Sequence, residues 1–211
     1  MTATVLSALG EKPTVTTDRG LQRAREILLA ARDILLEEGF AGLTMRGVAA
    51  RIDVSLSTVQ HYYRNQEVLV EALLAYLIEN MGAGIAAAIA EMADRDQRER
   101  LEVVLDYLLG VCRDPQVCGV FAEAWALGKR LPFAMQLMER MEERSRKQFY
   151  QLIVGLNPAV GRAEYRRRAA MIVMLLHGLM LQFPPQGTAA LSRKQLEGAV
   201  RAQVLEIATA L

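Results

Sequence analysis

Residues 43–69 read LTMRGVAARIDVSLSTVQHYYRNQEVL, and this stretch decides how the chain is expected to fold. The apolar residues of its first half repeat at the spacing of one buried helix face: Met45, Val48, Ala49 and Ile52. Thr44 can cap the start of that helix with its hydroxyl. Residues 53–55 interrupt the pattern, and Ser55 can cap a second helix from Leu56 to Tyr63. The pattern therefore predicts two short helices joined by a tight turn.

The second helix carries an outward face made almost entirely of hydrogen-bonding groups. Val59 and Tyr63 lie four residues apart and can face inward, while Val54 can fill the angle between the helices. A solvent-facing helix with no DNA to bind more usually carries pairs of Lys and Glu, which are absent between Leu56 and Tyr63. The pattern predicts a helix-turn-helix whose second helix enters the major groove of DNA. A structural helical corner with a polar outer face is the alternative.

Eight polar side chains of this stretch are candidates for contacts with DNA. Base readout is expected from Ser57, Gln60 and His61. Positioning on phosphate is expected from Thr44, Arg46, Thr58 and Tyr62, and Arg46 can also reach a base. Ser55, the candidate cap of the second helix, completes the set.

Residues from about 23 to 69 resemble the DNA-binding domain of TetR-type transcriptional repressors. The matching residues begin in the preceding helix and continue past the turn: Ile27, Ala30, Ala31, Leu35, Glu38, Gly39, Leu43-Thr44-Met45-Arg46, Val48-Ala49, Val54-Ser55, Thr58, His61-Tyr62, Glu67 and Leu69. The resemblance implies that the remaining residues form an all-helical ligand-binding and dimerisation domain, with the last two helices paired in a homodimer. Because the match includes both flanking helices, it weighs against the structural corner.

Four positions depart from the common pattern of that family. Asp53 stands where a turn glycine is usual, and Asp can adopt a left-handed backbone at modest cost. Gln60 replaces a frequent tyrosine and can bond bidentately to adenine. Tyr63 replaces a usual phenylalanine and should keep its core role. Gln66 replaces a frequent lysine, so one anchor on phosphate is missing.

Length and composition are those of an ordinary globular protein. The 211 residues are 52% hydrophobic and 23% charged, with a formal net charge of +1. Residues 1–64 hold 8 Lys and Arg against 7 Asp and Glu, so bulk charge gives no support for DNA binding. Attraction to DNA must come from a local patch, with Arg19, Arg23, Arg46 and Arg64 as candidates.

The sequence shows neither a recognisable targeting signal nor a cysteine pattern typical of disulfides or metal binding. The N-terminal 17 residues lack the basic segment of a secretory signal, and the longest apolar run, residues 169–183, is too short to span a bilayer. Cys112 and Cys118 suit neither a disulfide framework nor a metal site, so we expect two reduced buried thiols, with redox sensing as the alternative. We therefore expect a cytoplasmic protein without cofactor, metal or membrane contact.

The chain as a whole predicts an all-α fold of about nine helices. Residues 1–17 are expected to form a mobile tail, 18–64 a three-helix DNA-binding domain, and 65–211 a larger ligand-binding and dimerisation domain. The signals that start and stop the other helices are Gly39, Asn65, Asp94 or Asp96, Asp114-Pro115, Gly128, Pro132, Gly161, Pro184-Pro185, and Ser192 with Gln195. The basic run at 166–168 is expected to be a solvated face.

The last two expected helices carry wide apolar faces. One face comprises Met171, Met174, Leu175, Leu179 and Phe183, and the other Val200, Val204, Leu205 and Ala208. A symmetric dimer is favoured because a two-fold repeat in DNA needs two recognition helices at a fixed spacing. The alternative is that both faces fill the core of a monomer.

Large or polarizable side chains of the C-terminal part are candidates for an effector pocket. They are Tyr107, Phe121, Trp125, Met135, Met138, Phe149, Met174 and His177, and each is equally well explained as core. Trp125 is favoured because it is the single Trp and has Glu123 nearby, so its ring could stack on an aromatic or cationic ligand. His177, within an apolar helix, also fits a hydrogen-bonded core histidine.

These observations together predict a ligand-responsive transcriptional regulator. We expect a repressor that binds a palindromic operator in double-stranded DNA as a homodimer and is released by a small, largely apolar effector. An all-α enzyme is one rival class, but no catalytic motif with recognisable spacing occurs, and no catalytic residue is expected. A helical adaptor that binds only protein is the other rival, and salt-dependent binding to duplex DNA would separate it.

Overall fold

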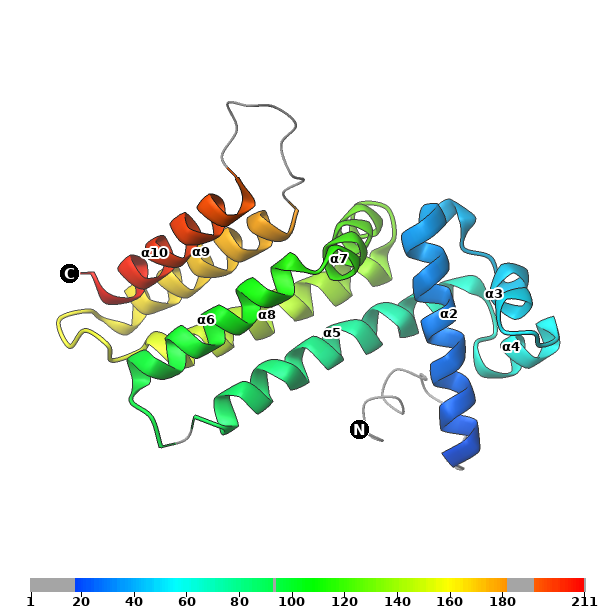
Figure 1. Ribbon diagram of the computed structural model, residues 1–211, viewed down its shortest axis with the longest axis horizontal. Coiled ribbons are helices and arrows are strands. Elements are labelled where there is room, and N and C mark those ends of the chain that lie inside the picture. The colour runs from blue at the N-terminus through cyan, green and yellow to red at the C-terminus, as the bar shows by residue number, and fades with distance from the viewer. Residues whose placement is uncertain (1–17, 93, 182–191, 211) are drawn as a thin grey trace. The chain divides into compact units, whose positions relative to one another are not determined.

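The computed structural model describes residues 18–92, 94–181 and 192–210. These residues form nine α-helices and no strand, which confirms the all-α expectation (Figure 1). The helices are α2 Asp18–Gly42, α3 Met45–Arg51, α4 Leu56–Tyr62, α5 Gln66–Ala90, α6 Gln97–Arg113, α7 Pro115–Gly128, α8 Pro132–Ile153, α9 Arg162–Met180 and α10 Arg193–Thr209. The expected tail at 1–17, Phe183 and the stop at Pro184-Pro185 lie outside the described residues.

Contacts between residues divide the chain into two compact units. The first extends to Ala83 and includes Glu123–Met138, and the second comprises Gly84–Ala122 and the residues from Glu139 onward. The first unit therefore holds the whole helix-turn-helix segment together with parts of α5, α7 and α8. The expected domain boundary between residues 64 and 65 stays a prediction.

The core of the first unit is built on the apolar stripe of α2. Ala24, Leu28 and Ala31 are fully buried, and Leu69 and Leu73 of α5 are buried in the same unit. Apolar burial of this kind contributes most of the stability of a helical domain. The apolar face of α2 is therefore a central part of this core.

Gly39 ends the regular part of α2. Its φ of 69° and ψ of −176° are non-helical, and a short helical turn then continues to Gly42. A positive φ of this size favours glycine because no Cβ opposes it. The expected stop at Gly39 is confirmed, and it turns the chain toward α3.

Helix α5 combines length with apolar composition. Residues Gln66–Ala87 would suffice, by these two properties alone, to cross a membrane, and 47% of that window is buried within the protein. Its buried residues include Val70 and Leu74, which pack in the first unit. The apolar character of α5 is thus explained in part by its role in the core.

The expected helix caps form in the structure. Asn65 Oδ1 accepts from the Val68 N–H at 2.9 Å, and Asp96, rather than Asp94, caps α6 by accepting from the Glu99 N–H at 2.8 Å. Ser192 and Gln195 form the predicted capping box of α10, in which each side chain accepts from the backbone N–H of the other. These caps satisfy backbone groups that helix ends leave unpaired.

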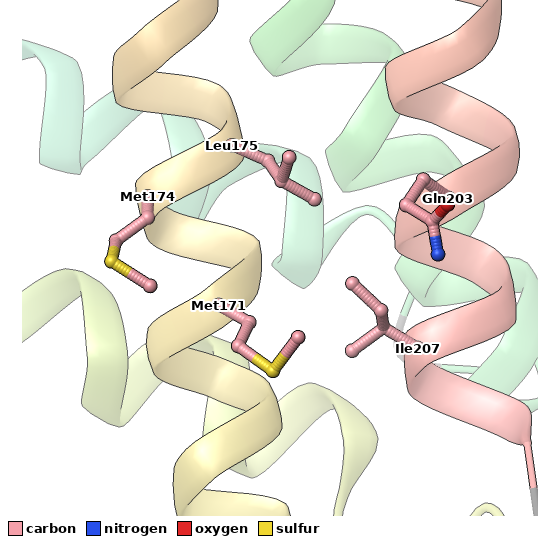
Figure 2. Close-up of a pocket in the computed structure, with 5 residues that line it drawn as sticks. All are labelled: Met171, Met174, Leu175, Gln203 and Ile207. Carbon is pink, nitrogen blue, oxygen red and sulfur yellow. The ribbon is translucent and has the colours of Figure 1, made fainter.

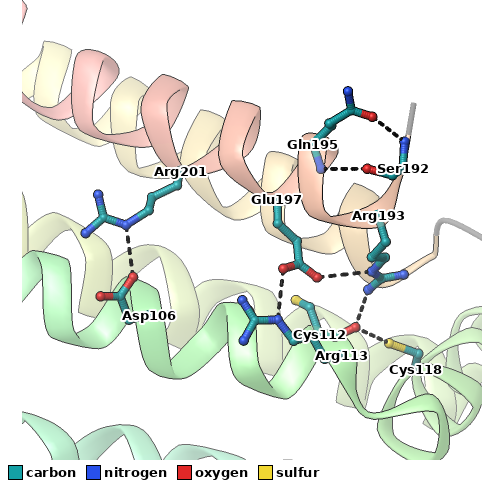
Figure 3. A network of polar contacts seen from close by, with 9 residues as sticks. All are labelled: Asp106, Cys112, Arg113, Cys118, Ser192, Arg193, Gln195, Glu197 and Arg201. Atoms are coloured by element: carbon teal, nitrogen blue, oxygen red, sulfur yellow. Dashed lines mark hydrogen bonds and ion pairs between the residues drawn. The ribbon is translucent and has the colours of Figure 1, made fainter. Parts of the chain in front are cut away.

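A buried carboxylate joins α10 to α6 in the second unit (Figure 3). Glu197 is 5% exposed and lies 2.8 Å from Arg113 Nε and 3.4 Å from Arg193 Nε. Arg193 also donates to the carbonyl oxygen of Cys112, near the end of α6. Because a buried charge is tolerated only when it is compensated, these arginines hold the two helices in register.

The cysteines lie beside the same network. Both are free, Cys112 is buried and Cys118 half-buried, and the Cys118 thiol donates to the Cys112 carbonyl oxygen at 3.1 Å. Burial, with a smaller contribution from Cys118, raises the pKa of the Cys112 thiol to about 12. Cys112 is therefore protonated at neutral pH and is the buried thiol that the sequence predicts.

The basic run at 166–168 is only partly solvated, so that expectation is wrong for Arg168. Arg166 and Arg167 are exposed, whereas Arg168 is 7% exposed. Arg168 donates to the Ala210 carbonyl oxygen at 2.9 Å and to Glu164 at 3.2 Å. A guanidinium at the C-terminal end of a helix is stabilised by the free carbonyls there, so Arg168 anchors the end of α10.

Candidate nucleic-acid interface

Side-chain caps shape both helices of the helix-turn-helix. Thr44 Oγ1 accepts from the Gly47 N–H at 3.0 Å, and Ser55 Oγ accepts from the Thr58 N–H at 3.1 Å. Asp53 has a φ of 52°, the left-handed conformation that the sequence predicts for this turn. The two predicted caps and the predicted turn are confirmed.

The inner faces of α3 and α4 are closed by apolar packing. Val48 and Val59 are fully buried, and Val54 is half-buried between the helices. Tyr63 is also fully buried, and its hydroxyl donates to the Ala24 carbonyl oxygen at 3.2 Å. This burial raises the pKa of Tyr63 well above its ordinary value. Tyr63 thus keeps the core position expected for it and satisfies its polar end.

The outer face of α4 is open to solvent. Ser57, Gln60 and His61 are exposed, and Thr58 and Tyr62 are half-buried. The rings of His61 and Tyr62 meet edge to face, with centroids 5.2 Å apart. Thr44, Arg46 and Ser55 are also exposed. All eight candidates for DNA contact are thus at least partly accessible, and their contacts with DNA stay predictions.

Several arginines near α4 are paired with carboxylates of the same protein. Arg51, at the end of α3, binds Glu37 of α2 through two contacts of 3.0 and 2.5 Å, and this lowers the pKa of Glu37. Arg23 pairs with Glu26 at 2.8 Å. Among the described residues, Arg46 and Arg64 have no carboxylate partner. Sequence reasoning missed the Arg51–Glu37 pair because no local periodicity joins residues 14 apart on two helices.

Three hydroxyls gather at the start of α4. Ser55 Oγ lies 2.8 Å from Ser57 Oγ and 2.8 Å from Thr58 Oγ1, in addition to its contact with the Thr58 N–H. Ser55 is thus engaged within the chain on every hydrogen-bonding site that a hydroxyl has. The sequence grouped it with residues that contact DNA, and its geometry fits the capping role better.

Five effector candidates lie in the second unit: Tyr107, Phe121, Phe149, Met174 and His177. Phe121 and His177 are in ring contact, with centroids 5.0 Å apart, and Phe149 is buried. Burial lowers the pKa of His177, while the smaller effect of Glu142 opposes it, so the imidazole is neutral at neutral pH. The Tyr107 hydroxyl occupies the space beside Gly84, where an added Cβ would meet it at 1.9 Å.

The other candidates are distributed differently from the sequence expectation. Trp125 and Met138 belong to the first unit, where the Lys129 ammonium lies 6.0 Å from the Trp125 ring centroid and Met138 is buried. Met174 is 60% exposed and Met135 is 47% exposed, so neither is a core or enclosed pocket residue as expected. The expectation failed because apolar spacing on a helix does not distinguish a face toward the core from a face toward solvent.

The exposed methionines of α9 border an apolar groove against α10 (Figure 2). Its lining residues are Met171, Met174, Leu175, Gln203 and Ile207. Leu179, Val204 and Ala208, which were expected on a dimer face, are instead buried at 3%, 0% and 0% exposure. They pack within the protomer because α9 and α10 lie side by side, with α6 beside both. The outward face is therefore offset from the predicted one and includes Gln203 and Ile207.

Sequence comparison places the helix-turn-helix in a known family. Residues 27–73 match the family model described as bacterial regulatory proteins, tetR family. An uncharacterized HTH-type transcriptional regulator in the dhlA 5' region of Xanthobacter autotrophicus is 35% identical over 109 residues. That alignment covers 51% of this chain and 54% of that protein, so the chain matches about half the length of this relative.

Solved structures share the fold over most of the chain. A transcriptional regulator from Rhodococcus sp. Rha1 aligns with a TM-score of 0.69 at 22% identity, over 87% of this chain and 94% of that chain. A transcriptional regulator from Saccharomonospora viridis, solved in complex with choline, aligns with a TM-score of 0.66 at 18% identity, over 87% and 95%. The family match gives residues 27–73 the helix-turn-helix of TetR-type regulators, and the chain shares its all-α fold with solved transcriptional regulators.

Proposed function

We propose that this regulator is a repressor that binds an inverted repeat as a homodimer and leaves it when a small effector binds. The observation that supports this most is the outer face of α4. There Ser57, Gln60 and His61 are exposed above a buried Val59 and Tyr63. An exposed polar face on a helix whose inner face is buried suits direct readout in a major groove.

The outward face of α9 and α10 supports the dimer. Met171 and Met174 are 46% and 60% exposed, and with Leu175 and Ile207 they form a contiguous apolar groove. Exposed apolar groups of this kind favour burial against another surface. A second copy of the same groove is the occupant we propose, because a two-fold interface is self-complementary and matches the symmetry of an inverted repeat.

The effector is proposed to bind in the second unit near Phe121 and His177. A neutral imidazole in contact with a phenyl ring places one polar side chain within an apolar setting, which suits a small and largely apolar molecule. The choline complex of the structural neighbour supports a ligand-responsive role, although it describes that protein. Trp125 belongs to the first unit, and its role as a ligand contact stays a prediction separate from this site.

The effector must act through a difference in affinity between two conformations. It has to bind the conformation that is incompetent for DNA better than the competent one. Helix α5 follows the helix-turn-helix directly, since its cap Asn65 is three residues after Tyr62. A tilt of α5 would therefore change the spacing of the two recognition helices.

The proposed function is tested by selection from genomic DNA. The purified protein is mixed with a fragment library at two salt concentrations, and the retained fragments are sequenced. Recovery of a short inverted repeat would support a dimeric sequence reader and supply the operator for effector screening. Retention of nothing, or of all fragments equally with steep loss at higher salt, would contradict a specific regulator.

A further inference from the structure

The hydroxyl of Ser55 has no hydrogen-bonding capacity left for DNA. A hydroxyl has one proton to donate and two lone pairs that accept. Ser55 Oγ accepts from the Thr58 N–H at 3.1 Å and lies 2.8 Å from both Ser57 Oγ and Thr58 Oγ1. The Thr58 N–H occupies one lone pair, and the two hydroxyl contacts use the other lone pair and the proton.

This saturation fixes the polarity of the two neighbouring hydroxyls. After the Thr58 N–H has taken one lone pair, Ser55 can accept from one hydroxyl and must donate to the other. The hydroxyl that donates to Ser55 has only lone pairs left to present outward. The hydroxyl that accepts from Ser55 keeps its own proton for an outside acceptor. Ser57 and Thr58 therefore present opposite polarity.

The chemistry of DNA decides which arrangement suits an interface. Phosphate oxygens only accept hydrogen bonds, so a hydroxyl that binds phosphate must keep its proton. Thr58 is half-buried at the margin of the outer face and is the proposed phosphate contact, whereas Ser57 is exposed and is proposed to face a base. With this assignment the Thr58 hydroxyl accepts from Ser55, and the Ser57 hydroxyl donates to Ser55.

We infer that Ser55 is a positioning residue that makes Ser57 a hydrogen-bond acceptor toward the major groove. In that groove the amino groups of adenine and cytosine donate, while the oxygens of guanine and thymine accept. Ser57 therefore selects an amino-bearing base at one position of each half-site. This inference rests on the proposed function, since it needs α4 to read DNA.

The test is the base preference of the position that depends on Ser57. All four bases are placed at each position of the selected operator, and affinities are compared for the wild-type protein and for Ser57→Ala. The wild type should prefer adenine or cytosine at one position per half-site, by about 2–10-fold for a single hydrogen bond. Ser57→Ala should lose this preference and leave the other positions unchanged.

A second variant removes the hydroxyl of Ser55 but keeps a residue that serves well as an N-cap. Glycine is almost as good an N-cap as serine but has no hydroxyl, so Ser55→Gly frees the Ser57 hydroxyl to donate or accept. The affinities for the four bases at that position should then differ by less than about twofold. Ser55→Thr keeps both the cap and the hydroxyl, and it should restore the preference.

A matched control separates positioning from simple stabilisation. Asn65→Ala removes an equivalent cap from the adjoining helix, where Asn65 Oδ1 accepts from the Val68 N–H at 2.9 Å. It should lower the melting temperature without changing base preference. If Ser55→Gly behaved in the same way, weakening binding equally for all bases, Ser55 would be a cap only and the inference would be overturned.

Two other outcomes would also overturn the inference, and they are distinguishable. If the position that depends on Ser57 preferred guanine or thymine, the polarity would be opposite to the one inferred, while the proposed function would stand. If the wild-type protein selected no sequence at all, the proposed function itself would fail, and the inference would fail with it.

Discussion

The dependence of DNA affinity on salt can be worked out from the charges around α4. Arg46 and Arg64 border that helix and have no carboxylate partner among the described residues, whereas Arg51 is neutralised by Glu37. Each phosphate that a protein neutralises on duplex DNA contributes about −0.9 to the slope of log affinity against log salt. Two arginines in each protomer of a dimer therefore contribute a slope of about −3.6.

Arg64→Gln should remove half of this contribution. The slope should become shallower by about 1.8, because one contact is lost from each protomer. At a fixed low salt concentration the variant should bind every sequence more weakly, with little change in sequence discrimination, since phosphate contacts carry no base information. Fluorescence anisotropy with the selected operator at four or five salt concentrations measures both quantities.

The matched control is the double variant Glu37→Gln with Arg51→Gln. It removes one positive and one negative charge that already neutralise each other at 2.5 Å, so the slope should stay at its wild-type value. The reasoning would be refuted if Arg64→Gln left the slope unchanged. It would also be refuted if the double variant changed the slope as much as Arg64→Gln does.

Three further predictions concern readout, assembly and packing. Gln60→Ala should lose about 1–3 kcal/mol of discrimination at one operator position if Gln60 reads a base, and equal weakening on operator and random DNA would assign it to the backbone instead. Met174→Glu places an unpaired charge in the proposed interface and should raise the dimer Kd, measured by sedimentation, about 100-fold or more. The control Met135→Glu, at a methionine that is 47% exposed in the first unit, should leave the dimer Kd unchanged. A dimer that survived Met174→Glu would contradict the groove as the dimer interface. Gly84→Ala should lower the free energy of unfolding, measured in urea, by at least about 1 kcal/mol despite the better helix propensity of alanine, because its Cβ would meet Tyr107 Oη at 1.9 Å. The same change in a Tyr107→Leu background should be neutral or stabilising. A single variant more stable than the wild type would show that Tyr107 moves aside freely.

Local signals in the sequence were sufficient for the helix-turn-helix. The caps at Thr44, Ser55 and Asn65, the left-handed Asp53 and the buried Tyr63 are each determined by residues within a few positions. For this reason periodicity and capping chemistry predicted them correctly.

Contacts between distant segments were beyond the reach of the same reasoning. The Arg51–Glu37 and Arg113–Glu197 pairs join separate helices, and no local spacing announces them. Arg168 belongs to a run of three arginines, yet it is buried because the end of α10 needs a donor for its free carbonyl. Met174 is predicted both as a pocket residue and as part of a dimer face, and the structure leaves it 60% exposed. A single helix cannot decide between these positions, because burial depends on which other helix covers a face.

The most direct test of the central claim compares sequence selection by two proteins that share one core. One is the wild type, and the other carries Ser57→Ala, Gln60→Ala and His61→Ala, three changes confined to the exposed face of α4. Both should be folded dimers with similar melting temperatures. The account predicts that the wild type enriches an inverted repeat from random duplex DNA and that the triple variant enriches none. Enrichment of the same repeat by the triple variant would contradict readout by α4.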